Sequence, residues 1–345
     1  MSTPVPEAKT PRDFTFITPR KRRLTEYEAV TIHQQWEPGG FDVGSTFLRG
    51  PDGRAWWEAS RTALKHPNWF AFRDPAQQWQ RTYVRMQAEQ ERSIERVTED
   101  AVADGQFAEL DRTWLSDILG KHYRVWSFFE YGLFRAFSPA QREALSDSLG
   151  NAICFQSFDH MRLGQAVVAH LLEIELAVTD FKDRGAKELW LNDPIYQPAR
   201  HLVEDLINTE DWAEQTLVVN LVVAPILSRI AWDTLVRKPA PLHGDVVTPL
   251  ILMTAERDRR RDLEYSKELA RMVTASDIAE SASNRAVISG WIAAWTPRVI
   301  AVARALAPVA ERLSKANVNF DAELDAAVKA QAELVTELGL NDRNA

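Results

Sequence analysis

The sequence predicts an all-α protein, built as a bundle of long helices. Only 14 glycines and 17 prolines interrupt 345 residues, and so few breakers leave long elements between them. From about residue 74 onward, apolar residues recur at the three- and four-residue spacing of a helix face. Hardly any stretch alternates apolar and polar residues for long enough to form a strand. In such bundles, side chains on facing helices build whatever site exists.

The first part of the chain lacks this spacing and predicts an irregular arm. Clusters such as Pro38-Gly39-Gly40 and Pro51-Asp52-Gly53 interrupt it. It also carries many aromatic side chains that would be costly to leave in water, so we expect it to wrap over a partner. We therefore divide the chain into an arm at 1–70, a helical bundle at 71–275 and C-terminal helices packed on the bundle at 276–345.

Capping residues mark several expected helix starts. Asp74 is placed as an N-cap with Pro75 at the first helical position, which predicts a helix of about 30 residues. Ser138-Pro139 predicts another start in the same way, for a helix that reaches Phe181. The spacing further predicts helices over 111–137, from Asn192, over 211–236, over 246–273, and over 277–338 with breaks at Thr296-Pro297 and Asn317.

Composition and charge exclude several classes of function. The formal net charge is −8, so no global attraction to nucleic acid is expected, and Arg20-Lys21-Arg22-Arg23 is interpreted as solvated or facing a partner. The apolar run 217–232 is shorter than the roughly 20 residues that span a bilayer, so we expect a buried helix and no membrane contact. A single cysteine and no visible signal peptide indicate a cytoplasmic protein.

The sequence shows no motif for a metal site or a nucleophile. None of the seven histidines follows a glutamate by three residues, although paired metal sites in helical bundles use Glu-x-x-His. The reverse spacing, at His170–Glu173 and His201–Glu204, marks either ligand pairs or, as we favour, exposed polar faces. Cys154 is interpreted as a small buried hydrophobe rather than a nucleophile. Residues 257–262 are expected to form a salt-bridged helix face.

Particular segments resemble a known family. Pro19-Arg20-Lys21-Arg22-Arg23-Leu24-Thr25-Glu26-Tyr27-Glu28 is followed by Phe72-Arg73-Asp74-Pro75, by Trp79-Gln80-Arg81-Thr82-Tyr83 and by Gln87. In this order they resemble the small (beta) subunit of the hydroxylase of bacterial multicomponent, soluble di-iron monooxygenases of the alkene and toluene type. The resemblance covers most of the chain and weakens after Asp277. It implies a ferritin-like bundle.

In that family the large subunit carries a di-iron centre that the small subunit has lost. By resemblance, His160 and Leu163 stand where a ligand segment has its glutamate and histidine, and Ala224 stands for a further carboxylate. A later segment keeps Glu256 but has Arg259 for its histidine, and Glu130 is the surviving ligand position. Because Arg259 would place positive charge where the cations should lie, we expect no metal and no catalytic residue in this chain.

The resemblance implies a non-catalytic role beside a catalytic large (alpha) subunit. That subunit would insert one oxygen atom from O2 into a small hydrocarbon, with epoxidation of short alkenes ranked above aromatic or alkane hydroxylation. A reductase system would supply electrons through NADH, FAD and Fe–S clusters in other components, and a coupling protein would accompany the hydroxylase. The alternative from another class is a stand-alone helical interaction protein.

The predicted interface with the large subunit lies on the arm and on the segment that follows it. Its residues are basic or aromatic, as expected for a contact surface. They are Arg20, Arg22, Arg23, Tyr27, Trp36, Trp56, Trp57, Trp69 and Phe72.

Overall fold

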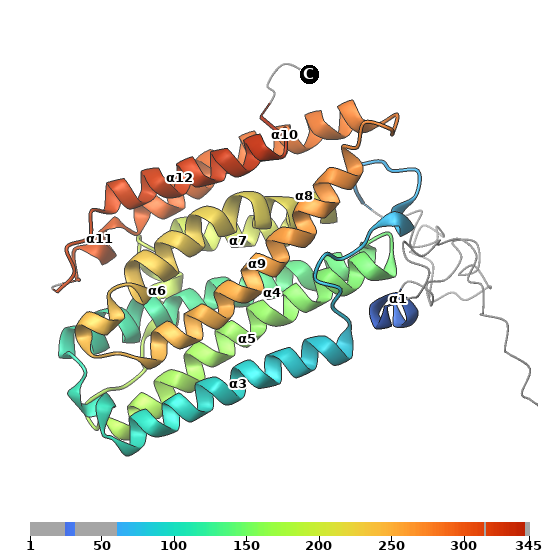
Figure 1. Ribbon diagram of the computed structural model, residues 1–345. Helices are drawn as coiled ribbons and strands as arrows, with labels where there is room; N and C mark the ends of the chain where they lie inside the picture. Colours follow the sequence, from blue (N-terminus) through green and yellow to red (C-terminus); the bar gives the residue numbers. More distant parts are fainter. Residues whose placement is uncertain (1–24, 32–60, 314, 342–345) are drawn as a thin grey trace, which may run out of the picture.

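The computed structural model describes residues 25–31, 61–313 and 315–341, and every regular element within them is a helix (Figure 1). The all-α fold class is therefore confirmed. The elements are α1 Glu26–Val30, η4 Trp69–Ala71, α3 Gln80–Ala103, η5 Gln106–Glu109, η6 Trp114–Tyr123, α4 Arg124–Glu143, α5 Asp147–Ala177, α6 Ala186–Asn192, α7 Gln197–Asn208, α8 Trp212–Val218, η7 Val219–Arg237, η8 Ala240–His243, α9 Val247–Val273, α10 Ser281–Ala305, α11 Ala307–Ala310 and α12 Phe320–Glu337.

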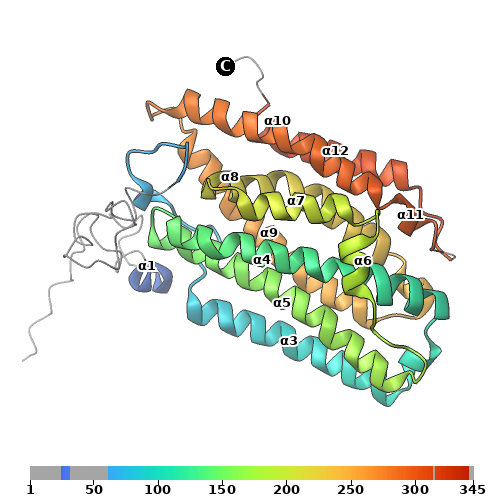
Figure 2. The same ribbon diagram turned by 180° about the vertical axis from the view of Figure 1, so that it is seen from behind.

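The long helices lie side by side in layers. α5 packs against both α4 and α9, and α9 packs against α3 and η7 (Figures 1 and 2). The C-terminal helices α10 and α12 cover η7 on the side away from α3. The most apolar helix is thus enclosed by its neighbours, and α3, α4, α5, α9 and η7 surround the polar groups described below.

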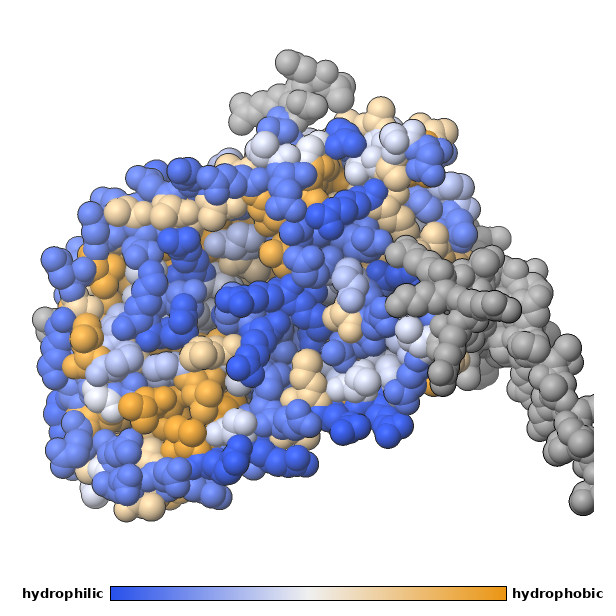
Figure 3. All heavy atoms as spheres, viewed as in Figure 1, coloured by the Kyte–Doolittle hydropathy of each residue, from blue (hydrophilic) through white to orange (hydrophobic). Residues whose placement is uncertain are grey.

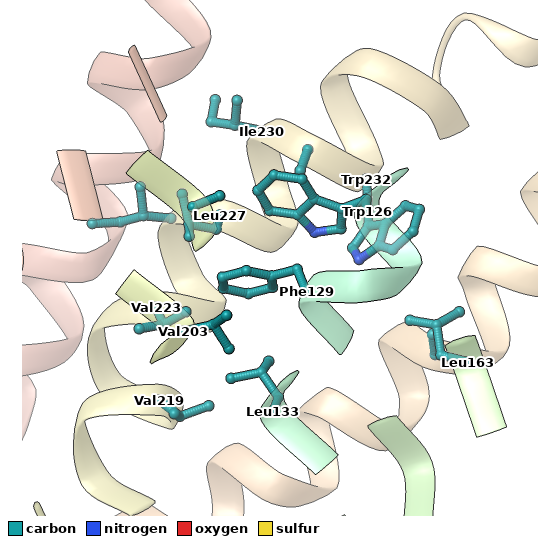
Figure 4. Close-up of a cluster of buried hydrophobic side chains, with 14 of the residues drawn as sticks. Trp126, Phe129, Leu133, Leu163, Val203, Val219, Val223, Leu227, Ile230 and Trp232 are labelled. Atoms are coloured by element: carbon teal, nitrogen blue, oxygen red, sulfur yellow. The ribbon is translucent and has the colours of Figure 1, made fainter. Parts of the chain in front are cut away.

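One continuous apolar core joins the layers. Side chains of α4, α7 and η7 interdigitate there, and α5 adds one more (Figure 4). Burial of this many large side chains is the main favourable term in folding. The labelled members are Trp126, Phe129, Leu133, Leu163, Val203, Val219, Val223, Leu227, Ile230 and Trp232.

The first long helix begins later than the sequence predicts. Asp74 does accept backbone hydrogen bonds, from Ala76 at 2.9 Å and Gln78 at 3.0 Å. These bonds close a turn rather than start a helix, because Gln77 adopts a left-handed φ of 51°. α3 starts at Gln80 and has 24 residues.

The predicted helix start at Ser138-Pro139 is wrong. α4 continues through Pro139 to Glu143, and the next helix begins at Asp147 with Ser146 as its N-cap. Ser138 does not cap a helix start, because its hydroxyl donates back to the carbonyl of Phe134 at 2.7 Å. Pro139 is exposed, but Phe137 and Ala140 beside it are buried, so packing of this helix face offsets the hydrogen bond that proline cannot make.

The predicted helices from Asp111 and Asp211 and over 246–273 are confirmed, with two differences of detail. η6 and η7 are π-helices, in which backbone N–H groups bond five residues back. α10 runs through Pro297 without the predicted break. The break near Asn317 does occur, between α11 and α12.

Two helical stretches are long and apolar enough, by length and composition alone, to cross a membrane: Trp212–His243 and Ser281–Ala310. The first is 78% buried inside the protein and the second 33%. A mostly buried stretch of this kind is what a core helix requires. The prediction that the run 217–232 is a buried helix is therefore confirmed.

The chain enters the bundle through residues 61–65. The carbonyl of Arg61 accepts from Trp212 N–H at 3.2 Å, and Ala63 N–H donates to Asp211 at 2.6 Å. Lys65 exchanges two hydrogen bonds with the Asn284 side chain, at 2.9 and 2.7 Å. This segment therefore holds together the N-terminal ends of α8 and α10.

Candidate functional site

A buried Glu–His pair lies at the centre of the bundle. Glu130 of α4 and His160 of α5 approach to 2.6 Å between Oε2 and Nδ1. Trp232 of η7 donates its indole N–H to the other oxygen, Oε1, at 2.8 Å. Phe137 stacks on the imidazole ring with centroids 5.6 Å apart. Both carboxylate oxygens of Glu130 are thus engaged by side chains of the protein itself.

The electrostatics of this pair favour an ionised glutamate. Burial alone raises the pKa of Glu130, but the hydrogen bond and charge of His160, the Trp232 N–H and the charge of Arg259 together bring it below its ordinary value. A buried carboxylate with this pKa is stabilised as an anion. Glu130 is therefore a buried carboxylate held between an imidazole and an indole.

A second layer of buried charge joins α3, α5 and α9. Arg261 donates to Asp159 and, at 2.9 Å, to Asp262. Gln87 of α3 donates to Asp159 at 2.7 Å and to Asp258 at 2.9 Å. Arg162 of α5 donates to Asp258 and so closes the network. The expected salt-bridged face at 257–262 is thus in part a buried network, in which Asp258, Arg261 and Asp262 point into the bundle.

Burial dominates the titration of this network. It raises the pKa of Asp159 to about 7 and that of Asp262 to about 6, although Arg261 opposes both shifts. Burial also raises the pKa of Tyr83, whose hydroxyl donates to Asp159 at 2.8 Å. A buried charged network stabilises the fold only when its groups are well hydrogen-bonded, because desolvation costs several kcal/mol per ion.

A third, neutral layer connects α5 to η7 and α9. Gln156 and Asn220 exchange amide hydrogen bonds at 2.8 and 2.9 Å. Asn220 also donates to Ser266 at 2.8 Å, and the Tyr265 hydroxyl donates to Gln156. Gln156 lies 3.4 Å from Nε2 of His160, which links this layer to the Glu–His pair.

A solvent-open cleft of about 590 Å³ leads toward these layers between η7, α9 and α12. Asn220 and Ala224 line its inner part, and Arg259, Arg260 and Glu256 line its α9 side. Glu256 pairs with both arginines, at 3.3 and 3.1 Å. In Figure 3 hydrophilic side chains cover the middle of α9, and apolar ones gather toward its N-terminal end.

The family model described as Methane/Phenol/Alkene Hydroxylase matches residues 50–277. The chain belongs to this family. The propane 2-monooxygenase hydroxylase small subunit of Rhodococcus jostii is 30% identical to this chain. The match covers 96% of this chain and 89% of the relative. The methane monooxygenase component A beta chain of Methylococcus capsulatus is 32% identical, and the match covers 84% of this chain and 76% of the relative. The predicted kinship with hydroxylase beta subunits is confirmed.

Solved hydroxylases share the fold of this family member. A chain of toluene 4-monooxygenase with bound toluene superposes with a TM-score of 0.71 at 26% identity, covering 84% of this chain and 94% of its own length. A chain of phenol hydroxylase from Pseudomonas sp. OX1 gives 0.75 at 21% identity, covering 93% and 92%. The ferritin-like bundle predicted by resemblance is confirmed.

The six predicted degenerate ligand positions of this hydroxylase chain fall in three places. Glu130 and His160 meet directly, and Arg259 lies close enough to lower the pKa of Glu130. Leu163, one turn after His160, is buried in the apolar core. Ala224 and Glu256 lie on the cleft. That these positions are the vestiges of metal ligands stays a prediction.

The donor set here does not fit a pair of metal ions. Glu130 is the one carboxylate of the six positions that lies in the core, and both its oxygens already accept from protein donors. The positive charge of the Arg259 guanidinium also acts on this carboxylate and would oppose a metal cation there. Within residues 25–31, 61–313 and 315–341, no group of three or more His, Cys, Asp and Glu side chains is placed to hold a metal.

Of the other candidate histidines, His170 is buried, so the exposed polar face favoured for it is wrong, whereas His201 is exposed as expected. His170 is buried, with Nδ1 3.4 Å from the Tyr123 hydroxyl, while its sequence partner Glu173 is partly exposed. His201 is exposed, and Glu204 pairs with Arg200 at 2.7 Å. Cys154 is half-buried, and burial raises the pKa of its thiol, which favours the unreactive form.

The predicted interface residues divide into two groups. Arg20, Arg22, Arg23, Trp36, Trp56 and Trp57 lie outside the described residues. Tyr27 and Phe72 are buried within this chain, where the Tyr27 hydroxyl accepts from Asp74 N–H at 3.1 Å. Trp69 is half-buried, edge-on to Trp212 at 5.6 Å. Their contact with a partner stays a prediction, and only Trp69 of these three leaves part of its surface free.

Sequence reasoning missed most of the polar core, including Trp232, Gln156, Asp159 and Asp262. One signal was available: Asn220 interrupts an apolar run that was itself expected to be buried. A buried amide needs partners, so other polar residues had to face it from neighbouring helices. Which residues these were depends on helix packing, which periodicity does not give.

Proposed function

We propose that this chain is the non-catalytic small subunit of a multicomponent monooxygenase hydroxylase, paired with a large subunit that carries the di-iron centre. The observation that carries the proposal is the saturated Glu130–His160–Trp232 group, in a chain whose relatives are hydroxylase small and beta subunits. The polar core then replaces a metal centre as the link between facing helices. Its role is to hold the bundle, while the partner performs the oxygen chemistry.

The proposal includes the remaining components of the system. Electrons would pass from NADH through FAD and Fe–S clusters of a reductase system, and a coupling protein would act on the large subunit. The complex would lie in the cytoplasm, without nucleic acid or membrane as partner. The names of the relatives, as small subunit or beta chain of a hydroxylase component, support the presence of further components.

The substrate is proposed as a small hydrocarbon. Epoxidation of short alkenes stays our first prediction. Alkane hydroxylation is the second candidate, because the propane and methane relatives, at 30% and 32% identity, are more similar than the toluene 4-monooxygenase beta subunit of Ectopseudomonas mendocina at 27%. Aromatic hydroxylation follows.

Co-purification from the native host tests the proposal. A tag on this chain should bring down a larger, iron-containing chain, and the complex supplied with its electron-transfer components should oxidise propene, propane or toluene. Product analysis ranks the three substrates. A monodisperse monomer with no larger partner would instead support a stand-alone helical interaction protein.

A further inference from the structure

One face of α5 is apolar and uncovered. Phe158, Val168, Leu172 and Leu176 are 49%, 41%, 54% and 73% exposed. They recur at helical spacing, so they form one stripe along the helix. From Phe158 to Leu176 the stripe spans about 27 Å at 1.5 Å per residue. We call these four residues the α5 stripe.

The stripe contains no charge. Seven residues from Phe158 to Ala177 are exposed. Four of them form the stripe, and the other three are the uncharged Gln165, Ala169 and Ala177. α3 of the same bundle is different, since most of its exposed residues are Arg, Glu or Asp. A solvent-facing helix normally carries charge on its outer face. The fully exposed face of α5 therefore lacks the charge of a solvent-facing helix, although the partly exposed Glu173 and Glu175 flank it.

The neighbouring helix extends this surface. Tyr131 of α4 is 47% exposed. Its ring lies 5.8 Å from that of Phe134, whose carbonyl accepts from Ser157, the residue before Phe158. Figure 2 shows α4 and α5 together on this side of the bundle, with no other helix in front of α5. The apolar surface thus begins at the α4–α5 seam and continues along α5.

We propose that the α5 stripe is the contact surface for the large subunit of the hydroxylase. The inference rests on the proposed function, which requires a permanent partner chain. The relatives' names as small subunit and beta chain of a hydroxylase component point to such a partner. A coupling protein that binds and dissociates would expose the surface to water in each cycle, whereas an obligate partner keeps it covered. Uncharged apolar surface is tolerated at a permanently covered interface.

The stripe forms the centre of that interface rather than all of it. A stable interface buries about 800 Å² on each partner, more than four side chains supply. Its central, fully desolvated residues carry most of the binding energy. Leu172 and Leu176 are the most exposed members of the stripe and are therefore expected to dominate.

Charge placed on the stripe tests the inference. We would co-express the tagged large subunit with the wild-type chain, with Leu172→Glu/Leu176→Glu, or with the control Val84→Glu/Val102→Glu. Val84 and Val102 are exposed apolar residues of α3, at 54% and 44%, and are not members of the stripe. We expect the stripe variant to lose at least tenfold of the co-purified chain, and the control to match wild type. Circular dichroism and melting temperature of each isolated chain should show both variants folded.

Each other outcome decides against the inference. Equal recovery of the stripe variant and the control overturns the stripe while leaving the proposed function intact. Failure of the wild type to co-purify overturns both. If the isolated wild-type chain is a dimer that the stripe variant converts to monomers, and the complex is unaffected, the occupant is a second copy of this chain.

Discussion

At the scale of single residues, Glu130 connects three helices, α4, α5 and η7, through hydrogen bonds. Its carboxylate accepts from His160 of α5 and Trp232 of η7, and all three side chains are buried. A buried donor that loses its acceptor keeps its full desolvation cost. The stability of the centre therefore depends on the charge of one carboxylate.

Substituting Glu130→Gln should test this dependence. The amide keeps the shape but loses the negative charge on which both donors act, so we expect the free energy of unfolding to fall by about 1–3 kcal/mol. Glu256→Gln is the matched control, since that carboxylate pairs with Arg259 and Arg260 at the partly exposed cleft. There the loss should stay under about 1 kcal/mol. Urea unfolding measures both, and equal losses would contradict the account.

His122 makes a pH-dependent contribution of known sign. Its Nε2–H donates to the Ala231 carbonyl at 2.9 Å, and burial lowers its pKa from 6.5 to about 4. Between pH 6.5 and 4, His122 is therefore protonated in the unfolded chain but neutral in the folded chain. The contribution is present above pH 6.5 and is lost as the pH falls toward 4, by about 3 kcal/mol at 1.36 kcal/mol per unit.

The comparison of wild type with His122→Gln isolates this effect. Asp159 and Asp262 have raised pKa values and act in the opposite direction, gaining stability as the pH falls from about 7 toward 4. They are common to both proteins and cancel in the difference. We expect the stability of wild type, relative to that of the variant, to fall by about 3 kcal/mol between pH 6.5 and 4. Parallel curves would mean that His122 has the same pKa in the folded and unfolded chains.

At the scale of elements, the crossing of α4 and α7 depends on a missing side chain. A Cβ built on Gly132 would lie 2.5 Å from Cγ2 of Val203. Gly132→Ala should therefore push the helices apart and cost about 1–3 kcal/mol. Adding Val203→Ala should recover part of the loss, because it removes the opposing methyl groups.

Gly290 of α10 is the matched control. A Cβ there meets nothing within 4 Å, so Gly290→Ala should stabilise the helix by about 0.5–1 kcal/mol through helix propensity. Chemical denaturation of the two alanine variants should give changes of opposite sign. A destabilised Gly290→Ala, or a neutral Gly132→Ala, would show that the packing at these positions is wrong.

The type and order of the main helices were predictable, because apolar spacing and caps such as Asp211 are local signals. Local signals failed where packing or a single backbone angle determines where a helix begins or ends. Gln77 stops a helix by its positive φ, and Pro139 is carried through one by its buried neighbours. The π-helical η7 has no signature in a 3.6-residue pattern. Glu130 and His160 were named through resemblance, while their contact required the structure.

At the scale of the whole molecule, the arm has a described anchor. Residues 61–65 bond to Asp211, Trp212 and Asn284, so they belong to the bundle. Deleting residues 1–60 also removes α1, whose buried Tyr27 bonds to Asp74 N–H, so it should lower the melting temperature of the bundle slightly. A deletion through residue 65 should lower it further. We further expect the shorter deletion to weaken co-purification with the large subunit. Unchanged recovery in that assay would remove the arm from the interface.

The division of labour between two subunits is the central claim, and iron binding tests it most directly. The isolated chain would be loaded with ferrous iron without oxygen, desalted, and analysed for metal beside the purified complex. We predict iron in the complex, and far less than one iron per molecule in the isolated, folded chain. One or more tightly bound irons per isolated chain, lost on Glu130→Ala/His160→Ala substitution, would contradict the account.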